Sequence, residues 1–219
     1  MKKILVIAPH PDDETLGVGG TILKRINHGH KVAWLIVTCS TNAKEIKKRN
    51  KQVSLVKKKY KFSKVFELNF SSSELDKVLL KVLIEKFSKI FNEFRPNEVF
   101  VPHINDAHTD HQKIFKAVSA TTKSFRYPFI NKILSYETVS ETGYGLKKIT
   151  KKGFDPNYYI NIDNYIKRKL QIAKIYKTEI KKHPFPRSLK NIKALAIVRG
   201  AESNNRHAEA FELLRYIEK

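Results

Sequence analysis

The sequence is poor in the features that mark secreted or membrane-spanning proteins. Cys39 is the only cysteine among 219 residues, which excludes an internal disulfide bond and predicts a reducing, cytoplasmic environment. No apolar run approaches the roughly 20 residues that a membrane-spanning helix needs. The apolar N-terminal run meets Pro9 and His10 before it reaches the length of a signal peptide, so we interpret it as a buried strand.

Negative charge is also scarce. The chain has 43 Lys and Arg against 21 Asp and Glu, a formal net charge of +22. Such an excess can attract nucleic acid, an anionic membrane or an anionic small molecule. The lysines are scattered in short clusters, and no zinc-finger, RRM or KH signature accompanies them. We interpret most of them as solvated helix faces and keep a basic nucleic-acid-binding module as an alternative from another class.

Strand-like and helix-like segments alternate along the chain, which indicates βαβ units and a mostly parallel sheet. Strands are predicted at Lys2–Ala8, Val32–Val37, Lys64–Leu68, Val99–Val101, Ile133–Tyr136 and Tyr158–Ile162. Helices are predicted at Thr15–Asn27, Ala43–Tyr60, Ser73–Phe94, His111–Ser124 and Asp163–Lys182, and residues 138–157 are predicted as a loop. The length suits one domain spanning residues 1–219. We therefore predict a single-domain, Rossmann-like α/β fold with helices on both faces of the sheet.

Two clusters of metal-capable side chains follow two of the predicted strands. They are Pro9–Glu14 and His108–His111. Because parallel strands end at the same edge of a sheet, we expect the clusters to meet there. His10 and Asp13 are three residues apart and can grip one ion together with a histidine of the second cluster, while Asp12 points elsewhere. Each cluster alone also fits helix capping, but their joint placement favours a site.

These residue types point to a particular chemistry. Two imidazole nitrogens and one carboxylate oxygen suit Zn²⁺, and three protein ligands leave a position for water. Zinc lowers the pKa of water that it binds, so the spare carboxylate of Asp12 could act as a general base. The second histidine could stabilise an oxyanion or protonate a leaving group. The sequence thus predicts one zinc ion per chain, with Fe²⁺ as an alternative, and hydrolysis of an amide or ester.

At these two clusters the sequence resembles the LmbE-like, or PIG-L, family of zinc-dependent N-deacetylases. The family's Ala/Pro-His-Pro-Asp-Asp-Glu motif is matched by Pro9–Glu14, and its His-x-Asp-His motif by His108–His111. Weaker likenesses at Arg49, Tyr136–Glu137 and Arg199–Gly200 extend the resemblance over nearly the whole chain. The family includes deacetylases of the glucosamine conjugates that lead to mycothiol and bacillithiol, and of the GPI-anchor precursor.

The resemblance implies a deacetylase that removes the acetyl group from an N-acetylated amino sugar, such as an N-acetylglucosamine conjugate. It implies that the zinc ligands are His10, Asp13 and His111. Asp12 would be the general base, and His108 would stabilise the oxyanion or assist departure of the amine. Asp110 would orient a neighbouring imidazole, and Arg49 would reach the sugar or its aglycone.

The sequence departs from the family pattern at positions that bear on the substrate. Cys39–Asn42 replaces an Asp-Gly-Glu-like segment, and Gln52 stands where many members have glutamate. A related zinc amidase that cleaves a thiol-sugar conjugate is therefore an alternative function. His103 is a candidate substrate contact, although an ordinary loop histidine fits equally. The glycine-rich run Gly17–Gly20 favours close helix packing over a dinucleotide loop. The aglycone and association into a homo-oligomer stay open.

Overall fold

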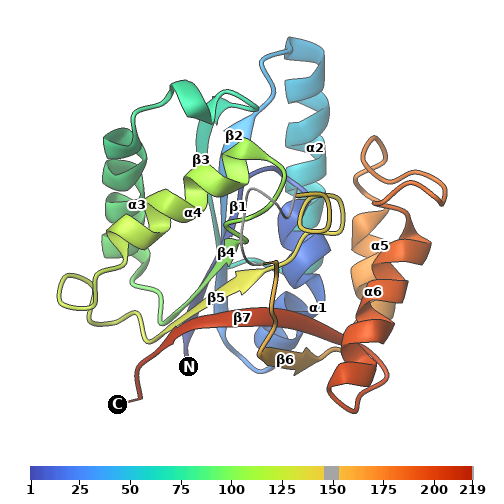
Figure 1. Ribbon diagram of the computed structural model, residues 1–219. Coiled ribbons are helices and arrows are strands. Elements are labelled where there is room, and N and C mark those ends of the chain that lie inside the picture. Colours follow the sequence, from blue (N-terminus) through green and yellow to red (C-terminus); the bar gives the residue numbers. More distant parts are fainter. Residues whose placement is uncertain (146–152, 219) are drawn as a thin grey trace.

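The computed structural model describes residues 1–145 and 153–218, which form one α/β unit (Figure 1). The strands are β1 Lys3–Ala8, β2 Lys31–Cys39, β3 Lys64–Ser71, β4 Glu98–Pro102, β5 Lys132–Tyr136, β6 Tyr158–Asn161 and β7 Ala208–Tyr216. The helices are α1 Asp13–Asn27, α2 Ala43–Tyr60, the 3₁₀ turn η1 Leu75–Lys77, α3 Leu80–Phe94, α4 Thr109–Thr121, α5 Ile166–Ala173 and α6 Leu189–Glu202.

All seven strands belong to one sheet in the order β3-β2-β1-β4-β5-β7-β6. The first five of these are parallel, and β7 runs antiparallel between β5 and β6. From β1 the chain builds outward to β2 and β3, then returns to the other side of β1 for β4 and β5. This reversal between β1 and β4 opens a crevice at the carboxyl ends of the two strands. The predicted Rossmann-like, mostly parallel fold is confirmed.

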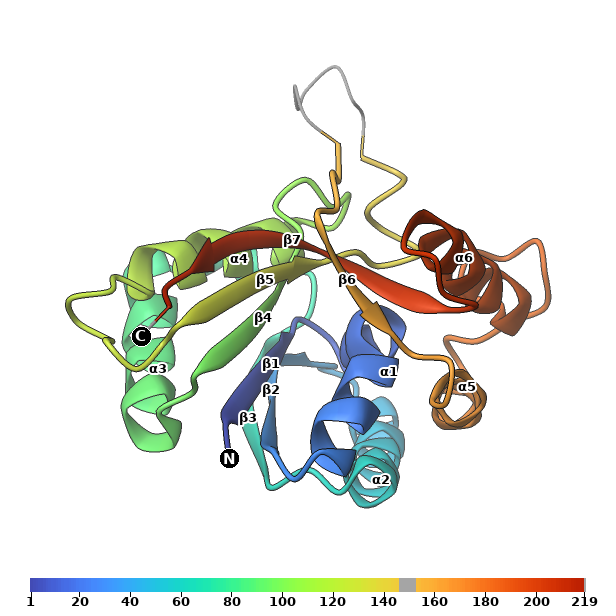
Figure 2. The same cartoon turned by 90° about the horizontal axis from the view of Figure 1, so that it is seen from below.

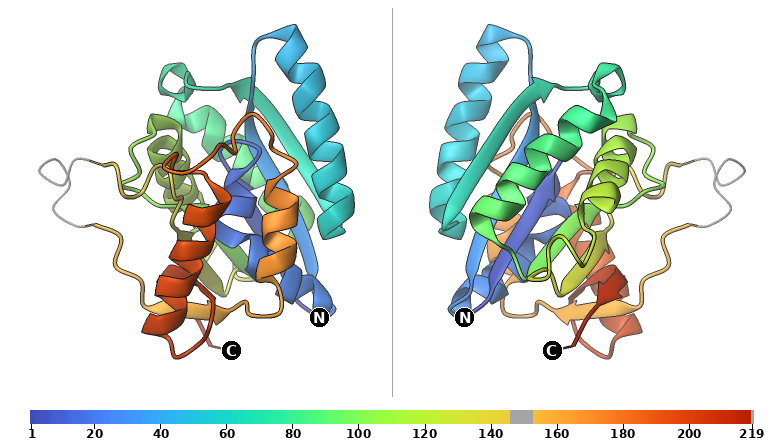
Figure 3. Two further views of the ribbon diagram at one scale, coloured as in Figure 1. Left: turned by 90° about the vertical axis from the view of Figure 1, so that its right-hand side faces the viewer. Right: turned by 90° about the vertical axis from the view of Figure 1, so that its left-hand side faces the viewer.

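Side chains of β1 alternate between two apolar cores, one on each face of the sheet. Ile4 and Val6 pack with apolar residues of α1, α2, α5 and α6, whereas Leu5 and Ile7 pack with residues of α3 and α4. The two helical layers are seen on opposite faces of the sheet in Figure 2 and Figure 3. Because both faces are buried, the strand is apolar at nearly every position.

The glycines of α1 allow the helix to approach the sheet closely. A Cβ atom at Gly17 would lie 2.3 Å from Cδ2 of Tyr136 in β5. One at Gly20 would lie 2.7 Å from Cγ2 of Ile162. No side chain larger than hydrogen fits at these separations without displacing its neighbours. The interpretation of the run as a packing surface is confirmed.

The single helix predicted at Ser73–Phe94 is wrong at its start. The structure has the short turn η1 there, and α3 begins only at Leu80. The backbone N–H groups of Ser73 and Leu75 donate to the carboxylate of Asp110, at 2.8 and 3.2 Å. Ser73 also has a φ of 61°, a left-handed conformation that a right-handed helix excludes, so no regular helix begins at this residue.

The helix predicted at Asp163–Lys182 is also too long, because α5 ends at Ala173. Tyr176 turns into the core, where it is 1% exposed and donates its hydroxyl hydrogen to Glu14 at 2.8 Å. The elements α6 and β7 were not predicted. Part of the predicted loop, residues 146–152, lies outside the described residues. Within the described ranges, every helix falls short of the length and apolar character that crossing a membrane requires.

Candidate active site

The two sequence clusters lie at the carboxyl ends of β1 and β4, the neighbouring strands at which the sheet reverses direction. The turn after β1 carries His10 and leads directly into α1, which begins at Asp13. The loop after β4 leads into α4, which begins at Thr109 and places His111 in its first turn. The topology thus brings together side chains that are about a hundred residues apart in the sequence.

Three ligand atoms converge at this edge. Oδ2 of Asp13 lies 3.3 Å from Nδ1 of His10 and 3.3 Å from Nε2 of His111. The three side chains are close enough to hold one ion. His10, His108 and Asp110 form a second close group. In the second group, the oxygens of Asp110 already accept hydrogen bonds from His10 and from two backbone N–H groups. In the first group, among the residues that the structure describes, Oδ2 of Asp13 accepts only the backbone N–H of His10 besides its contacts with the two imidazoles, so the first group is the better site.

A carboxylate holds the other nitrogen of each imidazole in the converging group. Nε2 of His10 lies 3.0 Å from Oδ2 of Asp110, and Nδ1 of His111 lies 2.8 Å from Oδ2 of Asp106. Nε2 of His111 is buried and has no hydrogen-bond partner among the described residues. Carboxylate–imidazole pairs of this kind orient metal ligands and raise their basicity. The donor set therefore fits a divalent cation such as zinc.

Asp12 stands beside this group in a strained conformation. Its φ of 145° is one that residues other than glycine rarely adopt, and such strain is typical of functional sites. Its N–H donates to Glu14 at 3.1 Å, and its carboxylate accepts from Nη1 of Arg187 at 2.9 Å. Burial and the negative charge of Asp13 raise the pKa of Asp12 to about 7, against the opposing effect of Arg187.

His108 offers the site a neutral donor. It occupies the N-cap of α4, and its Nδ1 accepts the backbone N–H of Asp110 at 3.1 Å. Nδ1 therefore carries no hydrogen, which leaves the ring hydrogen on Nε2. Burial, together with the neighbouring His10 and His111, lowers the pKa of His108 to about 4. The ring is thus uncharged at neutral pH.

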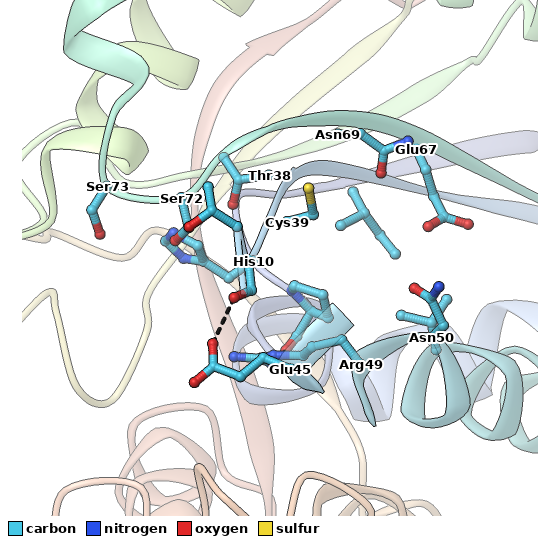
Figure 4. Close-up of a pocket in the computed structure, with 15 residues that line it drawn as sticks. His10, Thr38, Cys39, Glu45, Arg49, Asn50, Glu67, Asn69, Ser72 and Ser73 are labelled. Atoms are coloured by element: carbon cyan, nitrogen blue, oxygen red, sulfur yellow. Dashed lines mark hydrogen bonds between the residues drawn. The ribbon is translucent and has the colours of Figure 1, made fainter. Parts of the chain in front are cut away.

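A cleft of about 210 Å³ opens beside His10. Helix α2 contributes Glu45, Arg49 and Asn50 to one wall, and the ends of β2 and β3 contribute much of the other (Figure 4). The polar lining from β2 and β3 includes Thr38, Cys39, Glu67 and Asn69. Although the chain has a net charge of +22, the cleft has two carboxylates against one guanidinium, so the positive charge of the protein is not concentrated there.

Of the two predicted substrate contacts, Arg49 and His103, only Arg49 lies at the cleft. His103 does not, because it is 2% exposed, with Nδ1 3.2 Å from a carboxylate oxygen of Glu212 and its ring edge-on to Phe154. A role for His103 in substrate binding stays a prediction.

Three residues of the site were missed in the sequence. Asp106 holds His111 from the loop that precedes α4, and an acidic residue in that loop was the available signal. Arg187 and Glu179 reach the site from residues 174–188, between α5 and α6. No local pattern marks these two residues, because their place depends on how that segment crosses the surface of α1 and α2.

The fold and this cluster define a Rossmann-like α/β protein with a candidate metal centre at the point where its sheet reverses. The chain belongs to the PIG-L family, whose model, described as GlcNAc-PI de-N-acetylase, matches residues 5–122. It is 24% identical over 237 residues to the diacetylchitobiose deacetylase of Thermococcus kodakarensis, a match that covers 98% of this chain and 84% of that protein.

Solved structures with low sequence identity share the fold. The conserved protein TT1542 from Thermus thermophilus has a TM-score of 0.78 at 21% identity, covering 100% of this chain and 97% of the other. GalB, the 4-carboxy-2-hydroxymuconate hydratase from Pseudomonas putida, has a TM-score of 0.77 at 13% identity, covering 100% and 99%. Because proteins with different names share the fold, function must be argued from the site.

The converging atoms predict which variants lose the metal. His10→Ala and His111→Ala each remove one ligand and should leave the purified protein with little bound cation. Asp106→Asn should weaken binding by about 10- to 100-fold, because it releases the ring of His111. Elemental analysis after dialysis measures the stoichiometry, with the exposed His28→Ala as the control. Unchanged metal content in the two ligand variants would contradict the assignment.

The same imidazoles predict a pH dependence of metal binding. Burial lowers the pKa of both imidazoles. Hydrogen bonds to Asp110 and Asp13 nevertheless raise the pKa of His10 to about 9, and the charge of Asp13 and the hydrogen bond to Asp106 raise the pKa of His111 to about 10. A cation must displace these protons, so affinity should fall as pH falls, by up to about 100-fold per pH unit when two protons are released. Calorimetric titration in buffers of different ionisation enthalpy measures the proton count. An affinity that does not change between about pH 6 and pH 8 counts against this ligand set.

Proposed function

We propose that this chain is a zinc-dependent, cytoplasmic N-deacetylase that removes the acetyl group from an N-acetylated amino sugar. The observation that carries the proposal is the convergence of His10, Asp13 and His111 in a chain of the PIG-L family. The diacetylchitobiose deacetylase relative supports a sugar of the N-acetylglucosamine type. Fe²⁺ is the alternative cation, because the same ligands accept it.

When bound, the divalent cation would polarise the amide carbonyl and make water more acidic. His10, Asp13 and His111 would hold it. Asp110 and Asp106 hold the outer nitrogens of the two imidazoles, which leaves the inner nitrogens free to bind the cation. Asp12 and His108 are not among these residues, so Asp12 is available for proton transfer and His108 for stabilising negative charge.

Asp12 would move the proton. Its carboxylate accepts a proton from the attacking water as the water oxygen bonds to the acetyl carbon. The bond between the acetyl carbon and nitrogen then breaks, and Asp12 returns the proton to the departing amine. The products are acetate and the free amino sugar. A carboxyl group whose pKa is raised to about 7 can both take and give a proton near neutrality.

His108 would stabilise the charge that develops on the acetyl oxygen. Its hydrogen is on Nε2, because Nδ1 accepts from the backbone N–H of Asp110. A donor already held in place strengthens its bond to the oxyanion without further reorganisation. Arg49 would contact the sugar or its aglycone from the wall of the cleft. His103 is a further predicted contact.

The wild-type protein should release acetate from N-acetylglucosamine conjugates. A chelator should abolish the release and added Zn²⁺ or Fe²⁺ should restore it, since the cation supplies the electrophile. Acetate is measured across a panel of conjugates with neutral and anionic aglycones. Cleavage of a thiol-sugar amide without acetate release would instead support the amidase alternative. The absence of acetate release from the whole panel with metal-loaded protein excludes the proposal.

Two variants test the assigned roles. Asp12→Asn and His108→Ala should fold and retain the metal, because neither residue is a ligand in the proposed site. Their turnover should fall by about 100-fold or more, since each removes a group that acts in the transition state. Steady-state kinetics with parallel elemental analysis separates turnover from metal loss, and His28→Ala is again the control. Full activity in Asp12→Asn rules out the assigned base.

A further inference from the structure

Residues 174–188, which we call the 174–188 segment, reach the site from outside the residues matched by the family model. In Figure 1 they form the orange loop beside α2, above α5 and α6. Two contacts fix the start of the segment. Gln52 of α2 donates from Nε2 to the carbonyl of Ile175 at 3.1 Å, and Tyr176 donates to Glu14 of α1 at 2.8 Å. A glutamate in place of Gln52 could not donate this hydrogen bond when ionised.

Glu179 of this segment bridges two arginines. Its Oε1 accepts from Nη2 of Arg49 at 3.1 Å, and its Oε2 accepts from Nη1 of Arg187 at 2.9 Å. The three side chains are between 22 and 26% exposed, so they form a mostly buried group at the edge of the site. One carboxylate therefore sets the relative position of both guanidinium groups.

The two arginines hold consecutive residues of the turn after β1. Nη1 of Arg49 donates to the carbonyl of Pro11 at 2.8 Å. Nη1 of Arg187 donates to the carboxylate of Asp12 at 2.9 Å. Both hydrogen bonds are made to the turn that immediately precedes Asp13, a candidate metal ligand. The turn is thus held by hydrogen bonds at the carbonyl oxygen of Pro11 and at the carboxylate of Asp12.

The turn needs such restraint for two reasons. Asp12 has a φ of 145°, a conformation that costs free energy and persists only where the surroundings enforce it. Its carboxylate also lies next to the carboxylate of Asp13, so the two charges repel each other. A guanidinium fixed on Asp12 opposes this repulsion and keeps the side chain in one rotamer.

We propose that Glu179 and Arg187 are positioning residues that hold Asp12 in the geometry required for proton transfer. Arg187 acts directly on the carboxylate, and Glu179 acts through Arg187 and Arg49. The inference rests on the proposed deacetylase function and assigns a role in it to a part of the chain outside the matched family region.

The test compares Glu179→Gln and Arg187→Ala with the wild type and with Arg206→Ala, an exposed arginine that serves as the control. We expect kcat to fall about 10-fold in Glu179→Gln and about 100-fold in Arg187→Ala, because misplacement of an acting group costs rate. KM should stay within about twofold in Arg187→Ala, because Arg49 keeps its contacts there. Glu179→Gln weakens the bond to Arg49, a proposed substrate contact, so its KM should rise as well. Metal content and thermal unfolding are measured in the same samples.

Chemical rescue distinguishes positioning from structural damage. Millimolar guanidinium should restore part of the kcat of Arg187→Ala, and it should not raise that of the wild type or of Glu179→Gln. If Arg187→Ala does not fold, Arg187→Lys and Glu179→Gln carry the kinetic test. Unchanged kcat in all folded variants, or a loss that follows metal content, would overturn the inference.

A second measurement does not depend on turnover. Backbone amide exchange, read by mass spectrometry on peptides covering residues 9–16, should become faster in Glu179→Gln than in the wild type or in Arg206→Ala. Exchange that is unchanged in Glu179→Gln excludes restraint of this turn by Glu179 and the two arginines. If the wild type releases no acetate but this difference in exchange is present, the deacetylase function is excluded and the restraint of the turn by Glu179 is established.

Discussion

The site depends on one carboxylate oxygen, Oδ2 of Asp13, which faces the inner nitrogens of His10 and His111 at the same distance. His10 and Asp13 follow β1, whereas His111 follows β4. They meet because β1 and β4 pair as parallel neighbours, with Val6 opposite Phe100. Strand pairing fixes where both loops start. The short connections into α1 and α4 then fix where the ligands lie. The sheet therefore sets where the two loops begin, and side chains that contact the loops then hold the candidate ligands in place.

The surrounding carboxylates solve a second problem, which is that an imidazole can turn about its side-chain bonds. Asp110 and Asp106 each occupy one nitrogen of a histidine and so remove this freedom. Asp110 also accepts the backbone N–H groups of Ser73 and Leu75, at the place where the predicted helix does not form. A residue that orients a site ligand thus also determines local backbone structure. Replacing such a residue would change both the ring orientation and the path of the chain from β3 to α3.

The sequence was sufficient for features that are local. Strand ends, residue types and a period of three to four residues were enough to predict the α/β fold and to select His10, Asp13 and one histidine of the second cluster. The family resemblance singled out His111, and the structure brings these three side chains together. Asp106, Glu179 and Arg187 could not be selected in this way, because they become neighbours of the site through the path of loops in space. The helix break near Ser73 was missed for the same reason, since the backbone there contacts Asp110, which is 37 residues away in the sequence. Periodicity reports which face is apolar and carries no information on distant hydrogen-bond acceptors.

The charge of the cluster explains how so many buried acids coexist. Asp12, Asp13, Asp106 and Asp110 are nearly or fully buried around His10 and His111. In the absence of a cation, both imidazoles hold protons at neutral pH, because their pKa values are raised to about 9 and about 10. Two protons carry the same charge as one divalent ion. Exchange of two protons for one divalent ion would therefore leave the total charge of the cluster unchanged. The same acids that attract the cation thus keep the site assembled before it binds.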